Sequence, residues 1–250
     1  MKALAEATPG RTAVLEAARR LPGLTVVLPC RDERDNVAAA VAAAAEAARR
    51  VAHRFEVIVV DDGSRDGTGE IAAFLGRGTP EVRVVTHAEN RGYGAAVRSG
   101  IGAAAMPWIL LTDADLQFDL AELDSFVRRA SGADLVVGRR ARRADPLGRR
   151  LAGVSWNALV RRLFRLPVRD VDCAFKLMRA SLVQRLELTA DGAMVSTELI
   201  GRALATGATV HELDVVHRPR AAGEQSGASP RVIARALREL VALAPELRAP

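Results

Sequence analysis

The chain has 250 residues, of which 49% are hydrophobic and 26% charged, so it can bury a full core and is most simply one domain. Its two cysteines, Cys30 and Cys173, lack the spacing of metal ligands, which argues against a structural zinc and is typical of reduced thiols in a cytoplasmic protein. No apolar stretch is long enough to span a bilayer, and the first residues lack the apolar segment of a signal peptide.

The net charge of +6 favours anionic partners such as nucleic acid, phosphorylated substrates or an acidic membrane surface. Only two of the 36 basic residues are lysines, Lys2 and Lys176, and so strong a bias toward arginine can reflect genome composition. We therefore give the charge little weight in choosing among these partners.

Apolar runs and polar segments alternate regularly along the chain. After a polar helical lead-in at residues 1–23, the pattern predicts strands at 24–28, 55–60, 82–86 and 108–111, separated by helices at 36–50, 67–75 and 95–105. It then predicts a helix at 121–130, a strand at 133–137, an arginine-rich mobile loop at 139–150, helices at 156–166 and 197–205, a strand at 209–216, a Gly/Ser-rich hinge at 223–230 and an amphipathic basic helix at 231–243. This alternation predicts an α/β fold with a doubly wound, mostly parallel sheet that binds ligands at the C-terminal ends of its strands.

The stretch from Trp108 to Gln117 is an apolar run that ends abruptly at two acids. Since side chains two apart on a strand point the same way, Asp113 and Asp115 should face one small volume beyond it. Two like charges so close need a cation, and Mg²⁺ or Mn²⁺ binds one or two carboxylates while substrate phosphates complete its shell. The spacing predicts a metal-bridged phosphate site; the alternative is that the acids only cap a helix that begins near Asp119.

Polar clusters follow other predicted strands as well. They are Arg31-Asp32-Glu33, Asp61-Asp62, Asn90-Arg91-Gly92 and Gly138-Arg139-Arg140. Because the C-terminal ends of parallel strands meet at one edge of a sheet, these clusters indicate a single site assembled there. Gly92 and Gly94 also match part of a dinucleotide-binding turn, but Val97 occupies its third glycine position, so a tight turn between strand and helix is favoured.

The segment from Asp61 to Thr68, Asp-Asp-Gly-Ser-Arg-Asp-Gly-Thr, is more specific. Together with Pro29 to Glu33, Asn90 to Ala96 and Asp113 to Gln117, it resembles the ordered motifs of inverting family-two glycosyltransferases of the GT-A fold. The resemblance covers roughly residues 24–220, and within the family it is closest to dolichyl- or polyprenyl-phosphate mannose synthases.

The resemblance implies a role for each matching residue. The residues that would line the nucleotide sugar are Pro29, Arg31, Glu33, Asp61, Asp62, Asp113, Lys176, Arg218 and Arg220. Asp113, Asp115 and Gln117 would hold the metal. Arg139 and Arg140 would face the acceptor, and the catalytic set would be Asp115, Arg139 and Asp172.

Three departures from the family pattern bear on the donor. The loop Pro-Cys-Arg-Asp-Glu at Pro29 to Glu33 replaces the usual Pro-x-Tyr-Asn-Glu, so an aromatic and an amide are missing where the base should bind. Ala174 replaces the usual glycine in the segment from Asp172 to Lys176, and no lysine follows Ser226 in the closing segment. These changes leave the donor base and the closing-loop contacts open.

The function that the resemblance implies is transfer of a hexose, mannose or glucose, from a nucleotide diphosphate sugar to a polyprenyl or dolichyl phosphate, assisted by Mg²⁺ or Mn²⁺. GDP-mannose is the first expected donor and UDP-glucose the second, and nucleic acid is not expected as a partner. One alternative is transfer to a sugar hydroxyl or another small acceptor, for which Asp172 is the best candidate base. Another is a non-catalytic nucleotide- or polyanion-binding module.

We divide the chain into the lead-in at 1–23, a GT-A domain at 24–220, and a hinge with a C-terminal amphipathic helix at 221–250. That helix either packs on the domain or lies on a membrane surface. We expect a cytoplasmic protein that is peripheral at the inner face of the membrane.

Overall fold

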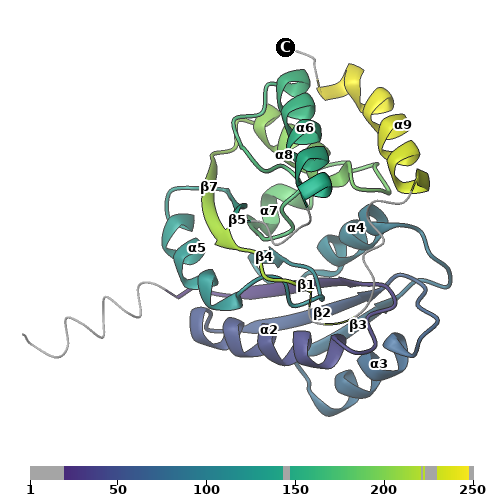
Figure 1. The fold of residues 1–250 in the computed structure, drawn as a ribbon. Helices are drawn as coiled ribbons and strands as arrows, with labels where there is room; N and C mark the ends of the chain where they lie inside the picture. The colour runs from purple at the N-terminus through teal and green to yellow at the C-terminus, as the bar shows by residue number, and fades with distance from the viewer. Residues whose placement is uncertain (1–19, 143–146, 221, 223–229, 248–250) are drawn as a thin grey trace, which may run out of the picture.

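The computed structural model describes residues 20–142, 147–220, 222 and 230–247. They form one seven-stranded sheet, in the order β3-β2-β1-β4-β6-β5-β7, with helices on both faces (Figure 1). The predicted α/β fold with a mostly parallel sheet is confirmed. Most of the lead-in and most of the hinge lie outside the described residues.

The first half of the chain builds the parallel part of the sheet. Its elements are β1 (Leu24–Cys30), α2 (Val37–Val51), β2 (Phe55–Asp61), α3 (Thr68–Gly78), β3 (Val82–Thr86), α4 (Tyr93–Ala103) and β4 (Trp108–Leu111). β1 pairs in parallel with both β2 and β4, and β2 pairs in parallel with β3. The C-terminal ends of these four strands therefore lie at one edge.

The second half extends the sheet beyond β4. Its elements are η1 (Leu120–Glu122), α5 (Leu123–Ala130), β5 (Leu135–Arg142), α6 (Leu147–Phe164), β6 (Lys176–Arg179), α7 (Ala180–Val183), α8 (Val195–Ala205), β7 (Val210–Val216) and α9 (Pro230–Leu247). β6 is antiparallel to β4 and to β5, so these two neighbours of β6 run in the same direction. The end of β5 consequently lies at the same edge as the end of β4.

The core has two layers because the strands are buried on both faces. Val26 and Leu28 of β1 face a cluster covered by α2 and α5, whereas Val27 between them faces a cluster covered by α4, α6, α8 and α9. This alternation is the period-two geometry of a strand. Every residue of β1 is buried, which explains why its sequence is a continuous apolar run broken only by Thr25.

Two sequence predictions need correction. The stretch 139–150, expected as a mobile loop, contains the end of β5 up to Arg142 and the start of α6 at Leu147. Arg139 and Arg140 pair in register with Asp214 and Val215 of β7, so neighbouring backbone overrides the low strand propensity of the arginine run. The short strand β6 was not predicted as a separate element, because no turn residue separates it from the apolar run before it.

The C-terminal helix packs on the domain. Ala236, Leu240 and Leu243 of α9 are buried in the second core cluster. Among the described residues, no helix combines the length and apolar character that crossing a membrane requires.

Candidate active site

The two acids after β4 lie at the middle of the sheet edge. The strand is held to β1 up to Thr112, whose N–H donates to the Val27 carbonyl at 3.2 Å. Beyond it, Asp113 accepts a hydrogen bond from the Tyr93 hydroxyl at 3.1 Å, and Asp115 accepts one from the Gln117 N–H at 3.1 Å. Asp115 is 7% exposed and Asp113 is half-buried, so both carboxylates line the edge.

The electrostatics of this pair favour a bound cation. Burial, followed by repulsion from Asp115, raises the pKa of Asp113 to about 7, against the opposing effects of the Tyr93 hydroxyl, Lys176 and Arg140. Burial also raises the pKa of Asp115, with Glu33 adding repulsion and Arg220 opposing it. Two carboxylates whose charged forms are disfavoured in this way gain stability from any cation placed between them.

The segment after β7 crosses over this pair. The Arg218 N–H donates to the Gln117 carbonyl at 2.8 Å, and the Gln117 side-chain amide donates to the Arg218 carbonyl at 2.9 Å. These bonds align the segment so that the Arg220 guanidinium lies 3.6 Å from Asp115 and also pairs with Glu33 in the loop after β1. Loops from three different strands thus meet at Asp115.

The loops after β2 and β3 are joined through Asp62. One of its oxygens accepts from the Arg91 N–H at 2.9 Å and contacts His87 Nδ1 at 2.7 Å, while the other accepts from the Gly92 N–H at 2.8 Å. The carboxylate is 3% exposed and already has three partners. In this structure it shapes the loop that would face a nucleotide, and its oxygens are occupied by protein donors.

The other candidates for the nucleotide side lie close by. Asp61 is buried and accepts from the Ser64 N–H at 3.0 Å, while Pro29 is buried at the end of β1. Arg31 is exposed, with its guanidinium 3.5 Å from Asp32. Arg31 is thus open to solvent, whereas Glu33 in the same loop is held by Arg220.

The arginine side of the edge begins at the end of β5. Arg139 forms a two-pronged ion pair with Asp214, and Arg140 forms another with Asp170, with Arg140 Nε and Nη2 each 2.8 Å from the carboxylate. Burial opposes the charge of Arg140, but the pair with Asp170 outweighs it and raises the pKa of Arg140. Asp172 lies two residues further on, with one oxygen 3.4 Å from the Asn157 amide.

The geometry therefore has a carboxylate half, at β1, β2 and β4, and an arginine half, at β5. The sequence model described as Glycosyl transferase family 2 matches residues 25–187, which contain both halves. The chain belongs to glycosyl transferase family 2.

The alignments with relatives in this family cover different shares of the two chains. A glycosyltransferase of Mycobacterium tuberculosis whose function is uncharacterized is 34% identical over 205 residues, 80% of this chain and 88% of the relative. The dodecaprenyl-phosphate galacturonate synthase of Rhizobium johnstonii is 34% identical over 169 residues. This match covers 66% of the present chain but only half of the synthase, 50%.

A solved structure gives the fold independently. Glucosyl-3-phosphoglycerate synthase from Mycobacterium tuberculosis, in complex with Mn²⁺ and UDP-glucose, superposes with a TM-score of 0.70 and 18% identity over 99% of this chain and 86% of that chain. This similarity confirms the GT-A type of fold. None of these three names specifies mannose, so the expected likeness to mannose synthases has no support from them.

The donor set at this family 2 edge fits one mode of metal binding. Among the residues that the structure describes, no three His, Cys, Asp or Glu side chains are grouped to hold an ion. Mg²⁺ and Mn²⁺ commonly need only one or two carboxylates when substrate phosphates and water complete the shell. Asp113 and Asp115, with their raised pKa values, fit that mode. The Gln117 amide nitrogen is already hydrogen-bonded to the Arg218 carbonyl, so only its oxygen remains for an ion.

The structure places Lys176 beneath the edge rather than at it. The side chain is 0% exposed, and its ammonium group donates to the Cys173 carbonyl and, at 3.1 Å, to the Ser196 hydroxyl. Burial lowers its pKa. A nucleotide sugar cannot touch this nitrogen without a rearrangement. The structure therefore does not place Lys176 in direct contact with the donor site, contrary to the prediction from the sequence. The charge of Lys176 nevertheless reaches the edge, because it favours the ionised form of Asp113 and opposes the rise in its pKa.

Two further partners were not found from the sequence. Tyr93 donates to Asp113, and His87 links Asp62 to the Ser99 hydroxyl, with His87 Nε2 2.9 Å from Ser99 Oγ. Tyr93 is the only tyrosine in the chain and stands where a helix follows a predicted strand end, a signal that could have marked it. Nothing in the local sequence distinguishes His87.

Proposed function

We propose that this family 2 enzyme is an inverting glycosyltransferase that moves a hexose from a nucleotide diphosphate sugar to a phosphate-bearing acceptor, polyprenyl phosphate in the first instance, with the help of a divalent metal. The observation that supports it best is the division of one sheet edge into carboxylates that follow β4 and arginines at the end of β5. Adjacent strands are spaced by about 4.8 Å, so β4 and β5 stand roughly 10 Å apart with β6 between them. A donor and an acceptor can meet across that distance.

On the donor side, Asp113 and Asp115 would hold the metal. When bound, Mg²⁺ or Mn²⁺ would neutralise the charge that develops on the leaving diphosphate. Arg220 lies beside Asp115 and can turn its guanidinium toward a diphosphate oxygen, which would release its contact with Glu33. The loop that Asp62 fixes at Arg91 and Gly92 would form the wall against the base.

On the acceptor side, a phosphate oxygen would attack the anomeric carbon while the bond from that carbon to the diphosphate oxygen breaks. The nucleoside diphosphate leaves with the bonding electron pair. A phosphate monoester has a second pKa of about 6 and is already largely dianionic at neutral pH, so no protein base has to remove a proton. Cationic side chains that orient the two anions are then the main requirement, as the arginine half would supply.

The donor proposal rests on relatives as well as on geometry. The solved synthase binds UDP-glucose with Mn²⁺, and we carry both over to this chain as the first donor and ion to test. GDP-mannose is the second donor to test. The loop from Pro29 to Glu33 lacks the usual aromatic and amide, so the sequence of this loop predicts neither uracil nor guanine as the base.

A second acceptor class has a specific observation in its favour. The name of the solved synthase implies an acceptor that carries a phosphate but is a soluble acid. Transfer to a hydroxyl of such an acid requires a base, and Asp172, near Asn157 at the arginine half, is our candidate for it.

The proposal is tested with the purified chain and a matrix of donors and acceptors. UDP-glucose, GDP-mannose and UDP-galacturonate are each combined with a short-chain polyprenyl phosphate or with 3-phosphoglycerate, in Mn²⁺, Mg²⁺ or EDTA. We expect product with a prenyl phosphate, dependence on the ion, and inversion at the anomeric carbon by NMR. Turnover that is undiminished in EDTA would overturn the metal assignment, and transfer to 3-phosphoglycerate alone would overturn the lipid acceptor.

A further inference from the structure

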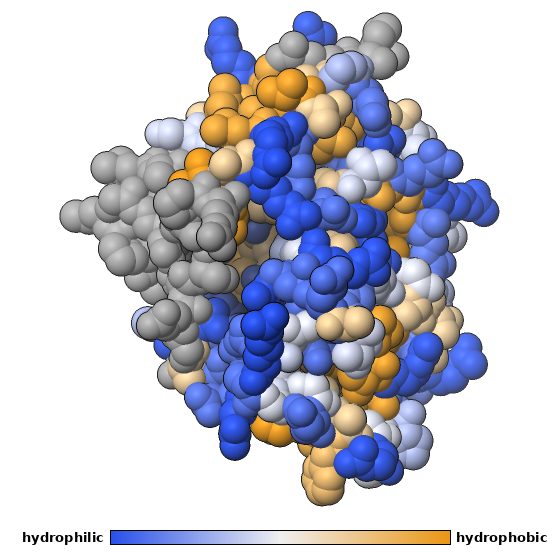
Figure 2. Space-filling model, turned by 90° about the vertical axis from the view of Figure 1, so that its right-hand side faces the viewer, coloured by the Kyte–Doolittle hydropathy of each residue, from blue (hydrophilic) through white to orange (hydrophobic). Residues whose placement is uncertain are grey.

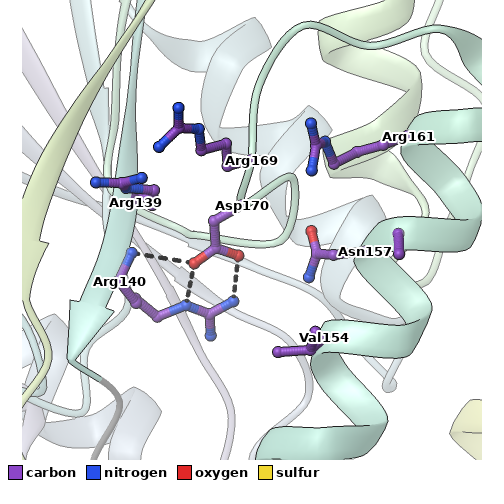
Figure 3. A pocket seen from close by; sticks show the side chains of 8 residues that line it. Arg139, Arg140, Val154, Asn157, Arg161, Arg169 and Asp170 are labelled. Carbon is purple, nitrogen blue, oxygen red and sulfur yellow. Dashed lines mark hydrogen bonds and ion pairs between the residues drawn. The ribbon is translucent and has the colours of Figure 1, made fainter.

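The structure contains a pocket that the sequence did not predict. It has a volume of about 220 Å³ and lies between the end of β5, helix α6 and the turn that precedes Asp170 (Figure 3). Pockets for drug-sized ligands begin at about 300 Å³, so this one suits a small headgroup rather than a nucleotide sugar. Its lining residues are Arg139, Arg140, Val154, Asn157, Ala158, Arg161, Arg169 and Asp170.

Two of its four arginines are occupied by carboxylates. Arg140 and Asp170 form a buried pair, with side-chain exposures of 15% and 4%, and Asp170 also accepts from the Arg140 N–H at 3.1 Å. Arg139 is held by Asp214 of β7. Figure 3 shows the Arg140–Asp170 pair bridged by hydrogen bonds. These two guanidinium groups have little capacity left for a ligand.

The other two arginines have no such partner. Among the described side chains, neither Arg161 nor Arg169 has a carboxylate within ion-pair distance, and the buried Nε of Arg161 has no hydrogen-bond acceptor at all. Of the other acids nearby, Glu212 accepts from the backbone N–H groups of Arg169 and Asp170, and Asp172 lies 3.4 Å from the Asn157 amide. In Figure 3 Arg161 extends from α6 and Arg169 from the turn, and both lie on the Asp170 side of the Arg140–Asp170 pair. A buried donor without an acceptor is costly, and a bound anion or a water molecule would satisfy it.

The walls are suited to a phosphate ester. Asn157 is committed to the protein, because its side chain donates to the Gly153 carbonyl at 3.0 Å and accepts from the Val171 N–H at 2.8 Å. Val154 and Ala158 stand one turn apart on α6 and give an apolar wall, and Val154 is 56% exposed. An alkyl chain attached to the phosphate can leave the pocket along that wall.

We propose that this pocket binds the phosphate group of the acceptor, with Arg161 and Arg169 as the contacting cations and the Arg139–Asp214 and Arg140–Asp170 pairs as fixed walls. Guanidinium groups bind phosphate through two parallel N–H donors, which is the geometry that two free forks provide. The inference rests on the proposed function in taking this phosphate to be the acceptor's. It moves the acceptor contacts from Arg139 and Arg140 to two residues further from the sheet.

The test measures binding separately from turnover. Isothermal titration of the full chain with a short-chain prenyl phosphate, 3-phosphoglycerate and inorganic phosphate is compared for the wild type, Arg161→Ala, Arg169→Ala and Arg161→Lys. The matched control is Arg162→Ala, an exposed arginine on the same turn of α6 that does not line the pocket. UDP binding in Mn²⁺ and the melting temperature of each variant show whether the donor site and the fold are intact.

We expect each alanine variant to weaken phosphate-ester binding at least about 10-fold, since a hydrogen bond to a charged group is lost. Arg161→Lys should be intermediate, because it keeps the charge but not the fork, and Arg162→Ala should match the wild type. Preference for the prenyl ester assigns the pocket to a lipid headgroup, and preference for 3-phosphoglycerate assigns it to a soluble acid; both support it. Equal binding by Arg161→Ala, Arg169→Ala and the control, or no phosphate binding by the wild type, overturns it. If the wild type did not bind UDP in Mn²⁺, the proposed donor chemistry would be refuted, whereas the phosphate-binding result for the pocket would still hold.

Discussion

The guanidinium of Arg220 lies 3.6 Å from the carboxylate of Asp115. The ligand-free protein thus places one of its own cations beside a carboxylate that we propose to bind a metal. The same guanidinium pairs with Glu33, and its Nε donates to the Ala222 carbonyl at 2.7 Å. When a metal and a diphosphate bind together, the ion would replace Arg220 as the cation beside Asp115. The diphosphate would then become the anionic partner of Arg220.

Arg220→Ala should therefore shift two affinities in opposite directions. The metal alone should bind about fivefold more tightly, corresponding to about 1 kcal/mol for the competing ion pair. UDP-sugar in saturating metal should bind about 10-fold more weakly, because a charged hydrogen bond to the diphosphate is lost. Mn²⁺ and donor titrations measure the two effects, with Arg50→Ala as the control, since Arg50 on α2 pairs with Asp124 and has a 42% exposed side chain. If the affinities for metal and for UDP-sugar changed in the same direction, Arg220 would not exchange its contact with Asp115 for a contact with the donor.

Asp115→Asn should abolish the enhancement of nucleotide binding by metal and lower kcat by at least about 100-fold, since the ion would no longer stabilise the leaving diphosphate. The substitution removes charge while keeping volume. The measurement is UDP binding with and without Mn²⁺, followed by single-turnover rates. Asp35→Asn, an exposed carboxylate near the same edge, is the control and should behave as the wild type. Near-normal rates for Asp115→Asn in saturating Mn²⁺ would refute the metal assignment.

Asp172→Asn should have a mild effect on kcat if the acceptor is a phosphate, because a phosphate dianion needs no base. The acid limb of kcat/KM should then follow the ionisation of the acceptor, near its second pKa of about 6, and should move upward with a more basic phosphonate analogue. A pH profile with both acceptors measures this. A collapse of kcat in Asp172→Asn, with donor binding intact, would point to a hydroxyl acceptor and general-base catalysis.

The exposed face of α9 should bind membranes. Ile233, Leu237 and Val241 are spaced four residues apart and are 52%, 48% and 73% exposed, while the adjacent face of the helix is packed in the core. A space-filling view shows apolar surface gathered at one end of the molecule beside strongly polar surface (Figure 2). We expect the double change Leu237→Asp and Val241→Asp to lower binding to anionic liposomes by at least about 10-fold, given about 1.5–3 kcal/mol per fully buried aliphatic side chain.

Point changes are preferable to deletion of α9, because its buried face contributes to the core. Ala242→Asp is the control, since this exposed residue lies on a different side of the helix from the apolar stripe. Sedimentation with liposomes at low and physiological salt separates apolar from electrostatic attachment, because charge attraction is screened within about 8 Å at physiological salt. Binding that is equal for the double variant and the control would assign this face to something other than a membrane.

The parts of the site that were predictable from sequence are those encoded in short segments. The strand before Asp113 and the spacing of Asp115 were readable because a buried strand and its polar end lie next to each other in the chain. The contact of Arg220 with Glu33 joins residues 187 apart and follows only from the placement of β7. Arg161 stands among several arginines on α6, and only packing decides that it lines the pocket while Arg162 is exposed.

The sheet order shows the same limit. β1 to β4 were predictable as a parallel set because each is an apolar run separated by a helix. The antiparallel insertion of β6 between β4 and β5 depends on pairing between Lys176–Arg179 and two distant strands. No periodicity within four residues can encode it. That insertion nevertheless brings Arg140 to the same edge as Asp113, and so determines the site.

At the opposite edge of the sheet, Glu56 joins three strands and a loop. The residue is 6% exposed, and its carboxylate accepts hydrogen bonds from the Thr25 hydroxyl and the Ala105 N–H, both at 2.7 Å, and from Arg83 at 2.9 Å. Burial alone would raise its pKa, but these hydrogen bonds outweigh burial and lower the pKa from 4.5. Because the folded-state pKa is depressed, the contribution to stability is fully present above the unfolded-state value of about 4.3 and is lost as pH falls through the folded-state value.

Glu56→Gln should therefore lower the free energy of unfolding by about 1–3 kcal/mol at pH 7, where the charged acceptor is lost, and the difference from the wild type should shrink as the pH falls below about 4. Urea unfolding at a series of pH values measures that difference. Glu46→Gln is the matched control, because Glu46 on α2 has a 75% exposed side chain and a single 3.9 Å contact with Arg50, and its effect should stay within about 0.5 kcal/mol. A deficit in Glu56→Gln that is the same at pH 7 and at acid pH would mean that packing, rather than the ionised carboxylate, is what Glu56 contributes.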